Sequence, residues 1–499
     1  MNLLERIKAL PSFLAGGYDG ATWTRDRPMA SWRGTMAVDE DRQIGSADRQ
    51  TLRLECANLY RNNPIVRGAV ERYADNVVGA GIIAQAKTSD ENWNKEAERL
   101  FGEWSKVADY RQRVHLRQIQ RMAVVSRMLA GESLYILTDG GQIQPVEADR
   151  LVTPQDMQTD PQVVDGIRID RSGIILGYYI GNRDQYGRVD NTTTRYIRKE
   201  NIIHVSAAYR PDQLRGIPEL APVVTTLADM DLLTKATLQK AKLDANNGVA
   251  IKTQEGAAKM PATGLRNNTP NAYKATDPQY ETINGLRVYY IRPGEDIQSL
   301  ASATPSSTYI PYNEFMLRLV GSSLGLPSEM LMLDFRQSSF SSNKAAMAQV
   351  YRTFVNWNYW LVESFMQRLW NWRIAKFIKD GQLSPAPIDD RGISEWYRVE
   401  WSQPDYSYLD PEGSIDAKMK EWNLGIGSIS QFARLRGSDG DDALAAKVRD
   451  IQTAYRIADQ ANAQTPGLNL RWQDVIASLM PGQQPAATEP PAGAVDAAG

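Results

Sequence analysis

Cysteine, histidine and long apolar runs are all scarce in this chain of 499 residues. It holds one cysteine, Cys56, and two histidines, His115 and His204. One cysteine excludes an internal disulfide framework and suits a reducing compartment. These three residues also cannot supply the Cys and His ligand sets that are typical of zinc sites. No apolar run approaches the roughly 18 residues that a membrane span needs, so we expect no membrane partner.

An excess of charge of either sign is also lacking. The chain has 57 Lys and Arg residues against 59 Asp and Glu residues, a net charge of −2. Such a balance argues against a chain that binds polyanions over its whole surface, while it leaves room for a local basic face.

Catalytic motifs are nearly absent. One G-x-S-x-G string occurs at residues 321–325, but a nucleophile elbow needs a strand before the serine and a histidine later in the chain. Both histidines lie upstream, and His204 falls in an alternating strand pattern that is typical of an ordinary sheet residue. The string is better explained as a helix end that stops at glycine. Because no phosphate loop or G-x-G-x-x-G string occurs either, we predict no catalytic residue, no cofactor and no metal.

The period of the apolar residues divides the first half of the chain into a helical part and a strand part. Helices are expected at residues 46–78 (with a break at 61–64, because Asn63 precedes a proline), 91–106 and 113–130. Short strands are expected at residues 133–138, 141–147, 166–170, 174–180, 194–198 and 202–206. A helical layer followed by a mostly antiparallel sheet predicts an α+β fold.

A long helix at residues 219–246 organises the second half. Its apolar face includes Leu227, Met230 and Leu238, and a polar stripe at helical spacing includes Lys235, Gln239 and Lys242. One strand is expected at residues 286–291, and a helix at 311–324 can return antiparallel to the first. A polar loop at 333–342, with Phe335, Arg336, Gln337 and Phe340, precedes a second long helix at 343–379 whose aromatic stripe we expect in the core.

Several strings in this layout resemble the portal proteins of lambda-type tailed phages. In chain order they lie at residues 59–63 (LYRNN), 76–79 (NVVG), 166–179 (GIRIDRSGIILGYY), 203–205 (IHV), 213–216 (QLRG), 317–326 (LRLVGSSLGL) and 425–437 (GIGSISQFARLRG). Each string is weak alone, but their order and spacing over roughly residues 30–455 make the resemblance specific. Residues 253–308 resemble the family least.

The resemblance implies a multidomain portal fold that assembles into a ring. In family terms it implies a wing (1–217 and 327–411), a stem of two helices (218–247 and 309–326), a clip (248–308) and a crown (412–480). The remaining residues, 481–499, are rich in Pro and Ala and are expected to be a disordered tail.

The resemblance also implies a function and partners. A dodecameric ring at one capsid vertex would pass double-stranded DNA during packaging and ejection, without reading its sequence. The large terminase subunit and a head-completion protein would dock on the clip, and the major capsid protein and scaffold on the wing. The protein would belong to the virion and assemble in the cytoplasm of the host bacterium.

Candidate sites follow from the same resemblance. Residues 333–342 would be the tunnel loop, which presents Phe335, Arg336, Gln337 and Phe340 to DNA. Lys235, Gln239 and Lys242 would face the channel or a neighbouring subunit, and a solvated helix face and a plain surface loop are the simpler interpretations of the same residues. Two other classes stay open: another structural component of the phage head, and a hydrolase whose carboxylates no motif marks.

Overall fold

The computed structural model describes residues 41, 44–252, 280–283, 286–291, 308–336, 339–402, 420–425, 440–465 and 469–477. The chain divides into two compact units. Unit 1 contains residues 1–77 and 105–369, and unit 2 contains residues 78–104 and 370–499. The expected tail, 481–499, most of the expected clip and a smaller part of the expected crown lie outside the described residues.

Unit 1 begins with helices. They are α3 (Ser46–Asn62), α4 (Pro64–Val78) and α6 (Leu116–Ala130). The break between α3 and α4 falls at Asn63, as the sequence predicted: its Oδ1 accepts the N–H groups of Ile65 and Val66, and Pro64 occupies the first position of α4. Helix α6 starts three residues later than predicted, after His115 accepts the N–H of Arg117, and ends at Gly131 in the left-handed conformation.

Two antiparallel sheets follow, where the sequence suggested one. The first has the order β3-β2-β8 and the second the order β4-β5-β6-β7. Their strands are β2 (Glu132–Leu137), β3 (Ile143–Val146), β8 (Ile202–Ser206), β4 (Val163–Val164), β5 (Ile167–Ile169), β6 (Ile175–Arg183) and β7 (Val189–Arg198). Strand β7 is five residues longer at its start than predicted, because the polar run before residue 194 pairs with the end of β6.

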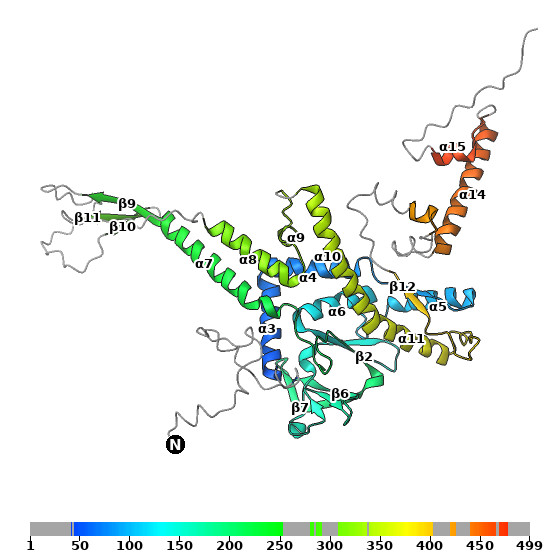
Figure 1. Ribbon diagram of the computed structural model, residues 1–499, viewed down its shortest axis with the longest axis horizontal. Helices are drawn as coiled ribbons and strands as arrows, with labels where there is room; N and C mark the ends of the chain where they lie inside the picture. The colour runs from blue at the N-terminus through cyan, green and yellow to red at the C-terminus, as the bar shows by residue number, and fades with distance from the viewer. Residues whose placement is uncertain are drawn as a thin grey trace, which may run out of the picture. The chain divides into compact units, whose positions relative to one another are not determined.

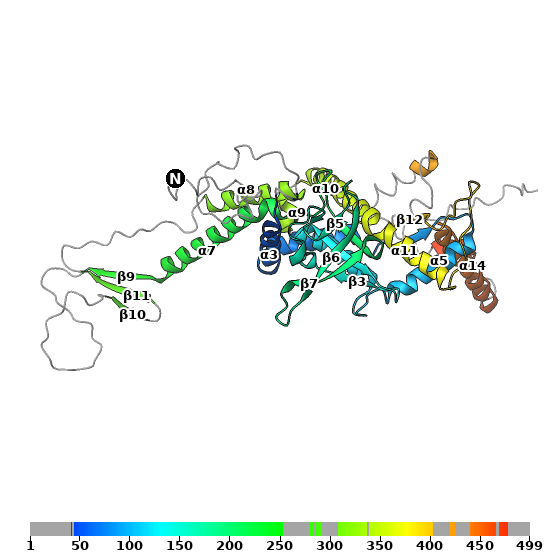
Figure 2. The ribbon, with the colours of Figure 1, turned by 90° about the horizontal axis from the view of Figure 1, so that it is seen from below.

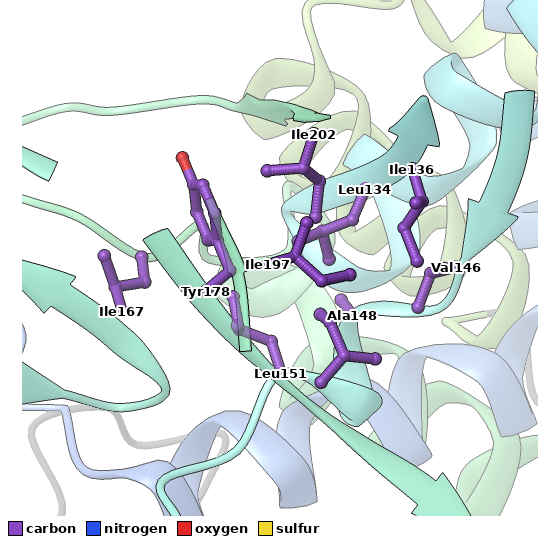
Figure 3. Close-up of a cluster of buried hydrophobic side chains, with 10 residues drawn as sticks. Leu134, Ile136, Val146, Ala148, Leu151, Ile167, Tyr178, Ile197 and Ile202 are labelled. Atoms are coloured by element: carbon purple, nitrogen blue, oxygen red, sulfur yellow. The ribbon is translucent and has the colours of Figure 1, made fainter. Parts of the chain in front are cut away.

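The two sheets share one apolar core. Leu134 and Ile136 of β2 pack with Tyr178 of β6 and Ile197 of β7, and all four are buried (Figure 3). Short 3-10 turns, Ala148–Arg150, Gln155–Met157 and Lys199–Asn201, connect the strands. Burial of these aliphatic side chains is the main driving force for this part of the fold. The predicted α+β class is confirmed.

The second half of unit 1 is built on α7 (Val224–Asn246) and α8 (Tyr309–Leu324), which lie side by side in both ribbon views (Figures 1 and 2). Helix α7 starts later than residue 219 because Pro222 sits in a 3-10 turn, Ala221–Val223. Between the helices, β9 (Asn247–Lys252), β10 (Tyr280–Ile283) and β11 (Leu286–Ile291) form a sheet with β11 in the centre. The predicted strand at 286–291 is confirmed.

A short helix, α9 (Ser328–Met332), leads to the second long helix. This helix starts at Phe340, three residues before the predicted position, and comprises α10 (Phe340–Leu361), a π-helical segment (Val362–Met366) and α11 (Gln367–Lys379). Phe354, Phe365 and Leu369 are fully buried, which confirms that the stripe belongs to the core.

Unit 2 contains a two-stranded sheet and an aromatic core. Its elements are β1 (Ala84–Ala86), α5 (Glu91–Ser105), most of α11, β12 (Val399–Trp401), α14 (Gly440–Gln464) and α15 (Trp472–Ala477). The ring of Trp370 is fully buried, with its centroid 5.0 Å from Phe101 and 6.3 Å from Trp401. Such tilted and edge-on contacts add to the area that the rings bury.

Candidate functional site

The side-by-side helices α7 and α8 hold an open groove between them. Its volume is about 390 Å³. The groove is lined by Asp229, Leu233, Thr237 and Lys240 of α7 and by Thr308, Tyr309, Tyr312 and Met316 at the start of α8. The α7 residues recur every three or four positions, which defines the face of α7 that meets α8.

The predicted polar stripe lies on the other side of α7. Lys235, Gln239 and Lys242 are all exposed, and at 100° per residue they point away from the groove residues. The ammonium of Lys235 is 2.5 Å from Asp231, one turn earlier. Leu238, predicted on the apolar face, is 53% exposed because it too points away from α8. The outer face of α7 therefore offers cations and two leucines, Leu232 and Leu238, to a partner or to solvent.

Helix α8 carries an apolar stripe of its own. Tyr312, Phe315 and Leu319, spaced by three and four residues, are each about half exposed (50%, 52% and 47%). We call these three residues the α8 stripe. Seams at this spacing are typical of helices that pack against another helix.

The predicted loop is shorter than expected because α10 begins at Phe340. Phe335 is 43% exposed. The Arg336 guanidinium donates to both carboxylate oxygens of Asp334, at 2.8 and 2.6 Å. That hydrogen-bonded arginine lowers the pKa of Asp334 to about 2. Gln337 and the side chain of Phe340 lie outside the described parts of the chain, so the structure places two of the four predicted residues.

A buried charge network, which the sequence did not reveal, lies at the N-terminal end of α7. We call this end the root of α7. Glu132 of β2 is fully buried and accepts hydrogen bonds from Arg215 Nε (2.8 Å), Arg53 (2.6 Å), the Gly216 N–H (2.9 Å) and His204 Nε2 (2.9 Å). Burial opposes ionisation of Glu132, but the charges of Arg215 and Arg53 outweigh it and hold the pKa well below its usual range. His204 is thus part of this network as well as a sheet residue.

Arg215 is the centre of the network. Its side chain is fully buried, and besides Glu132 it contacts Asp165 (2.9 Å) and donates to the carbonyls of Leu151 and Ala148 (both 3.2 Å). Burial opposes the charge of Arg215, yet Glu132 and Asp165 raise its pKa above the usual value. A buried arginine is stable only when its donors are paired, and here the chain pairs them itself.

A third acid links the network to the segment before α3. Asp41 accepts the backbone N–H groups of Leu214 (2.7 Å) and Arg215 (3.2 Å), and its carboxylate lies 3.3 Å from Arg49. Burial raises the pKa of Asp41, although these bonds act in the opposite direction. We call residues 214–217, which lead into α7, the strap. Asp41 accepts hydrogen bonds from its backbone, and the network holds the side chain of Arg215.

Glycines allow this strap to approach α6 closely. A Cβ at Gly131 would lie 2.3 Å from the backbone of Ile217, and one at Gly216 would lie 2.2 Å from the Gly131 carbonyl oxygen. Gly131 also has φ = 79°, which disfavours any other residue. The string at 213–216 is thus explained by packing: the arginine enters the network and the glycine lets the two backbones touch.

Two further contacts fix the roots of both helices. Arg127 of α6 pairs with Glu219 (2.7 Å) and lies over the rings of Trp357 and Trp360, 3.8 and 4.4 Å from their centroids. The Tyr73 hydroxyl donates to the Leu324 carbonyl at the end of α8. Gly325 then caps α8 in the left-handed conformation, which confirms that the G-x-S-x-G string is a helix end.

Metal-ligand groups and membrane-spanning helices are two features that the described residues lack. Within the described ranges no three His, Cys, Asp or Glu residues gather as metal ligands, and none of the described helices has the length and apolarity needed to cross a bilayer. Buried charges at the start of α7 are paired with one another, and exposed polar and apolar side chains lie along α7 and α8. The fold is α+β, and the paired helices α7 and α8 carry exposed polar and apolar side chains that are available for contacts.

Comparisons with known proteins give the family. The model of the lambda family of phage portal proteins matches residues 25–358. The portal protein of Escherichia phage N15 is 21% identical over 87% of this chain and 88% of its own length, and portal protein B of Escherichia phage lambda is 19% identical over 87% and 89%. The chain therefore belongs to the lambda family of phage portal proteins.

Among solved structures, the chain aligns with chains of gene transfer agent particles. A chain of the native virion has a TM-score of 0.41 at 12% identity, and a chain of the empty-particle neck has a TM-score of 0.42 at 15% identity. Each alignment covers 77% of this chain and 93% of the other. As a family member, the chain is a structural protein of the virion that forms a ring at a capsid vertex.

Proposed function

We propose that twelve copies of this chain form the ring, and that double-stranded DNA passes through its channel during packaging and ejection. Family membership carries this proposal. The α8 stripe supports it, because Phe315 and Leu319 are about half exposed in the single chain, and an exposed apolar surface of this kind is typical of a protein contact.

In this proposal the chain has the division of the portal family. Residues 1–217 and 327–411 form the wing, 218–247 and 309–326 the stem, 248–308 the clip and 412–480 the crown. The clip docks the large terminase subunit and later a head-completion protein, and the wing contacts the major capsid protein and scaffold. Assembly takes place in the cytoplasm of the host bacterium, and the protein itself catalyses no reaction.

The proposed contact with DNA needs no tight site. Lys235 and Lys242 on the outer face of α7, and Phe335 and Arg336 before α10, supply a few cations and one aromatic ring per chain. Repetition around a ring converts them into a phosphate-directed, salt-sensitive surface without base readout. DNA can then slide past them.

Electron microscopy of the negatively stained, purified protein, combined with its mass in solution, tests the proposal. We expect rings with a central channel and a mass near a dozen chains of 55.8 kDa. A monodisperse monomer in several buffers would contradict it, because each proposed role depends on the ring. Rings of another copy number would correct the stoichiometry and leave the channel function in place.

A further inference from the structure

A surface segment of unit 1, residues 106–117 (KVADYRQRVHLR), carries positive charge that its own acid does not balance. Lys106, Arg111, Arg113 and Arg117 are all exposed, and no side chain in the described ranges forms an ion pair with them. We call this segment the basic loop. Its single acid, Asp109, is only 2% exposed. The net charge of the whole chain is −2, so the loop is a local exception.

The buried acid is used to shape the loop. The Asp109 carboxylate accepts the backbone N–H groups of Arg111 (3.2 Å) and Arg113 (3.0 Å). Between these arginines, Gln112 has φ = 54°, a left-handed conformation that these bonds help to hold. Asp109 therefore fixes the backbone under the arginines and leaves their guanidinium groups at the surface.

Strand β3 holds the loop from the other side. The Tyr110 N–H donates to the Ile143 carbonyl, and the Ile143 N–H donates to the Ala108 carbonyl, both at 2.8 Å. A surface loop with this many backbone bonds loses little conformational entropy when a partner binds. The basic loop is thus a preorganised surface.

Two arginines and two acids of neighbouring segments lie close to the loop. Burial lowers the pKa of Arg150, and the like charges of Arg183 and Arg111 lower it further. The carboxylates of Glu147 and Asp149, which act in the opposite direction on Arg150, both bind Arg183. Two acids thus accompany these two arginines, so the unbalanced positive charge lies on the basic loop itself.

Apolar side chains among the cations indicate what kind of partner fits. Val107 is 54% exposed and Tyr110 is 53% exposed. A phosphate backbone is bound by cations and polar groups, and an exposed valine adds nothing to it. Protein interfaces, in contrast, are enriched in Arg and Tyr and place apolar contacts beside charged ones. The combination favours a polypeptide over a nucleic acid.

We propose that the basic loop is a docking surface for an acidic polypeptide segment of another phage head protein. Carboxylates of that segment would bind Arg111 and Arg113, and an apolar residue between them would lie against Tyr110. The proposal rests on the proposed function only for the source of the partner. The binding surface itself lies within one chain and does not require the ring.

Fluorescence anisotropy with the full-length protein tests the docking surface. The probes are a fluorescein-labelled peptide of repeated Glu-Glu-Phe, the same peptide with Gln for each Glu, and a labelled DNA duplex. We expect the acidic peptide to bind, more weakly as salt rises, and the Gln peptide not to bind. Arg111→Glu with Arg113→Glu should weaken binding on the order of tenfold or more, because each change replaces attraction by repulsion. Tyr110→Ser should weaken peptide binding several-fold.

A control variant carries the same change of charge elsewhere in unit 1. Arg171→Glu with Lys199→Glu replaces two exposed cations in other turns and should leave peptide binding unchanged. Equal weakening in both double variants would overturn the proposal, since binding would then follow net charge alone. Tighter binding of the duplex than of the acidic peptide, lost with Arg111 and Arg113, would overturn it in favour of a nucleic-acid surface.

Solution mass and thermal unfolding of each variant separate this proposal from the ring. Rings that fail to bind the peptide in the wild type contradict the docking surface and leave the portal function intact. A wild-type monomer that binds the peptide through Arg111 and Arg113 supports the docking surface and contradicts the ring. A loop variant with an unchanged unfolding temperature but lost binding supports the proposal directly.

Discussion

The root of α7 and its outer face use charged residues in opposite ways. At the root, Arg215 and Glu132 are fully buried and find every partner inside the chain. On the outer face, the Lys235 side chain is 66% exposed and reaches only Asp231, one turn away. The chain thus fixes its own geometry where its charges are buried, and it leaves binding capacity for other molecules where they are exposed.

Burial also determines how much each charged group contributes to the free energy of unfolding. A buried charge pair costs much desolvation to form, but removal of one partner leaves the other charge without solvent or a counterion. An exposed pair is screened by water and salt, and its loss is nearly neutral. Substitutions at the root should therefore change stability, whereas substitutions on the outer surfaces should change binding and assembly.

The largest effect is expected for Arg215→Met. Loss of this guanidinium leaves Glu132 and Asp165 buried with one cation fewer, and we expect unfolding free energy to fall by about 3–5 kcal/mol. Urea denaturation, followed by circular dichroism, measures it. The exposed Arg171→Met should shift the midpoint very little. A loss at Arg215 no larger than at Arg171 would mean that the network does not hold the root of α7.

Local signals in the sequence predicted the helices and strands well. They could not predict the buried charge network, which depends on residues far apart in the sequence. Asn63 before Pro64 and the glycine at 325 mark helix ends because capping depends on neighbouring residues alone. Arg215 meets Glu132 and Asp165 only after two sheets have formed, at separations of 83 and 50 residues. No spacing rule connects them, so the resemblance to portal proteins marked the string at 213–216 without giving its physical reason.

The candidate site was predicted in part for the same reason. Helical period alone placed Lys235, Gln239 and Lys242 on one exposed face. The helical spacing of apolar residues does not show which of them contact α8. Leu238 was therefore assigned to the wrong face. The π-helical segment at Val362–Met366 has no Gly or Pro to announce it either.

A smaller effect on stability, but a large one on assembly, is expected in the α8 stripe. Phe315→Ser with Leu319→Ser changes two half-exposed side chains, so the unfolding free energy should change by no more than about 0.5 kcal/mol per site. The ring should dissociate, which light scattering with size exclusion measures. Ile174→Ser with Leu176→Ser, also exposed, is the control and should leave the ring intact. Intact rings in both variants would remove the α8 stripe from the subunit interface.

The smallest effect on the fold is expected at the loop before α10, where both changes concern exposed groups. Phe335→Ala with Arg336→Ala should leave ring assembly and unfolding temperature unchanged and should impair DNA packaging in an in vitro assay with empty heads. Asp334→Ala offers a matched opposite change, because it releases Arg336 from its ion pair with Asp334 and should strengthen the salt-sensitive contact with DNA. Lost assembly, unaffected packaging, or the same response in both variants would count against this loop as a DNA contact. Opposite responses would show that Arg336 acts through its charge, as a group left for DNA and not for the fold.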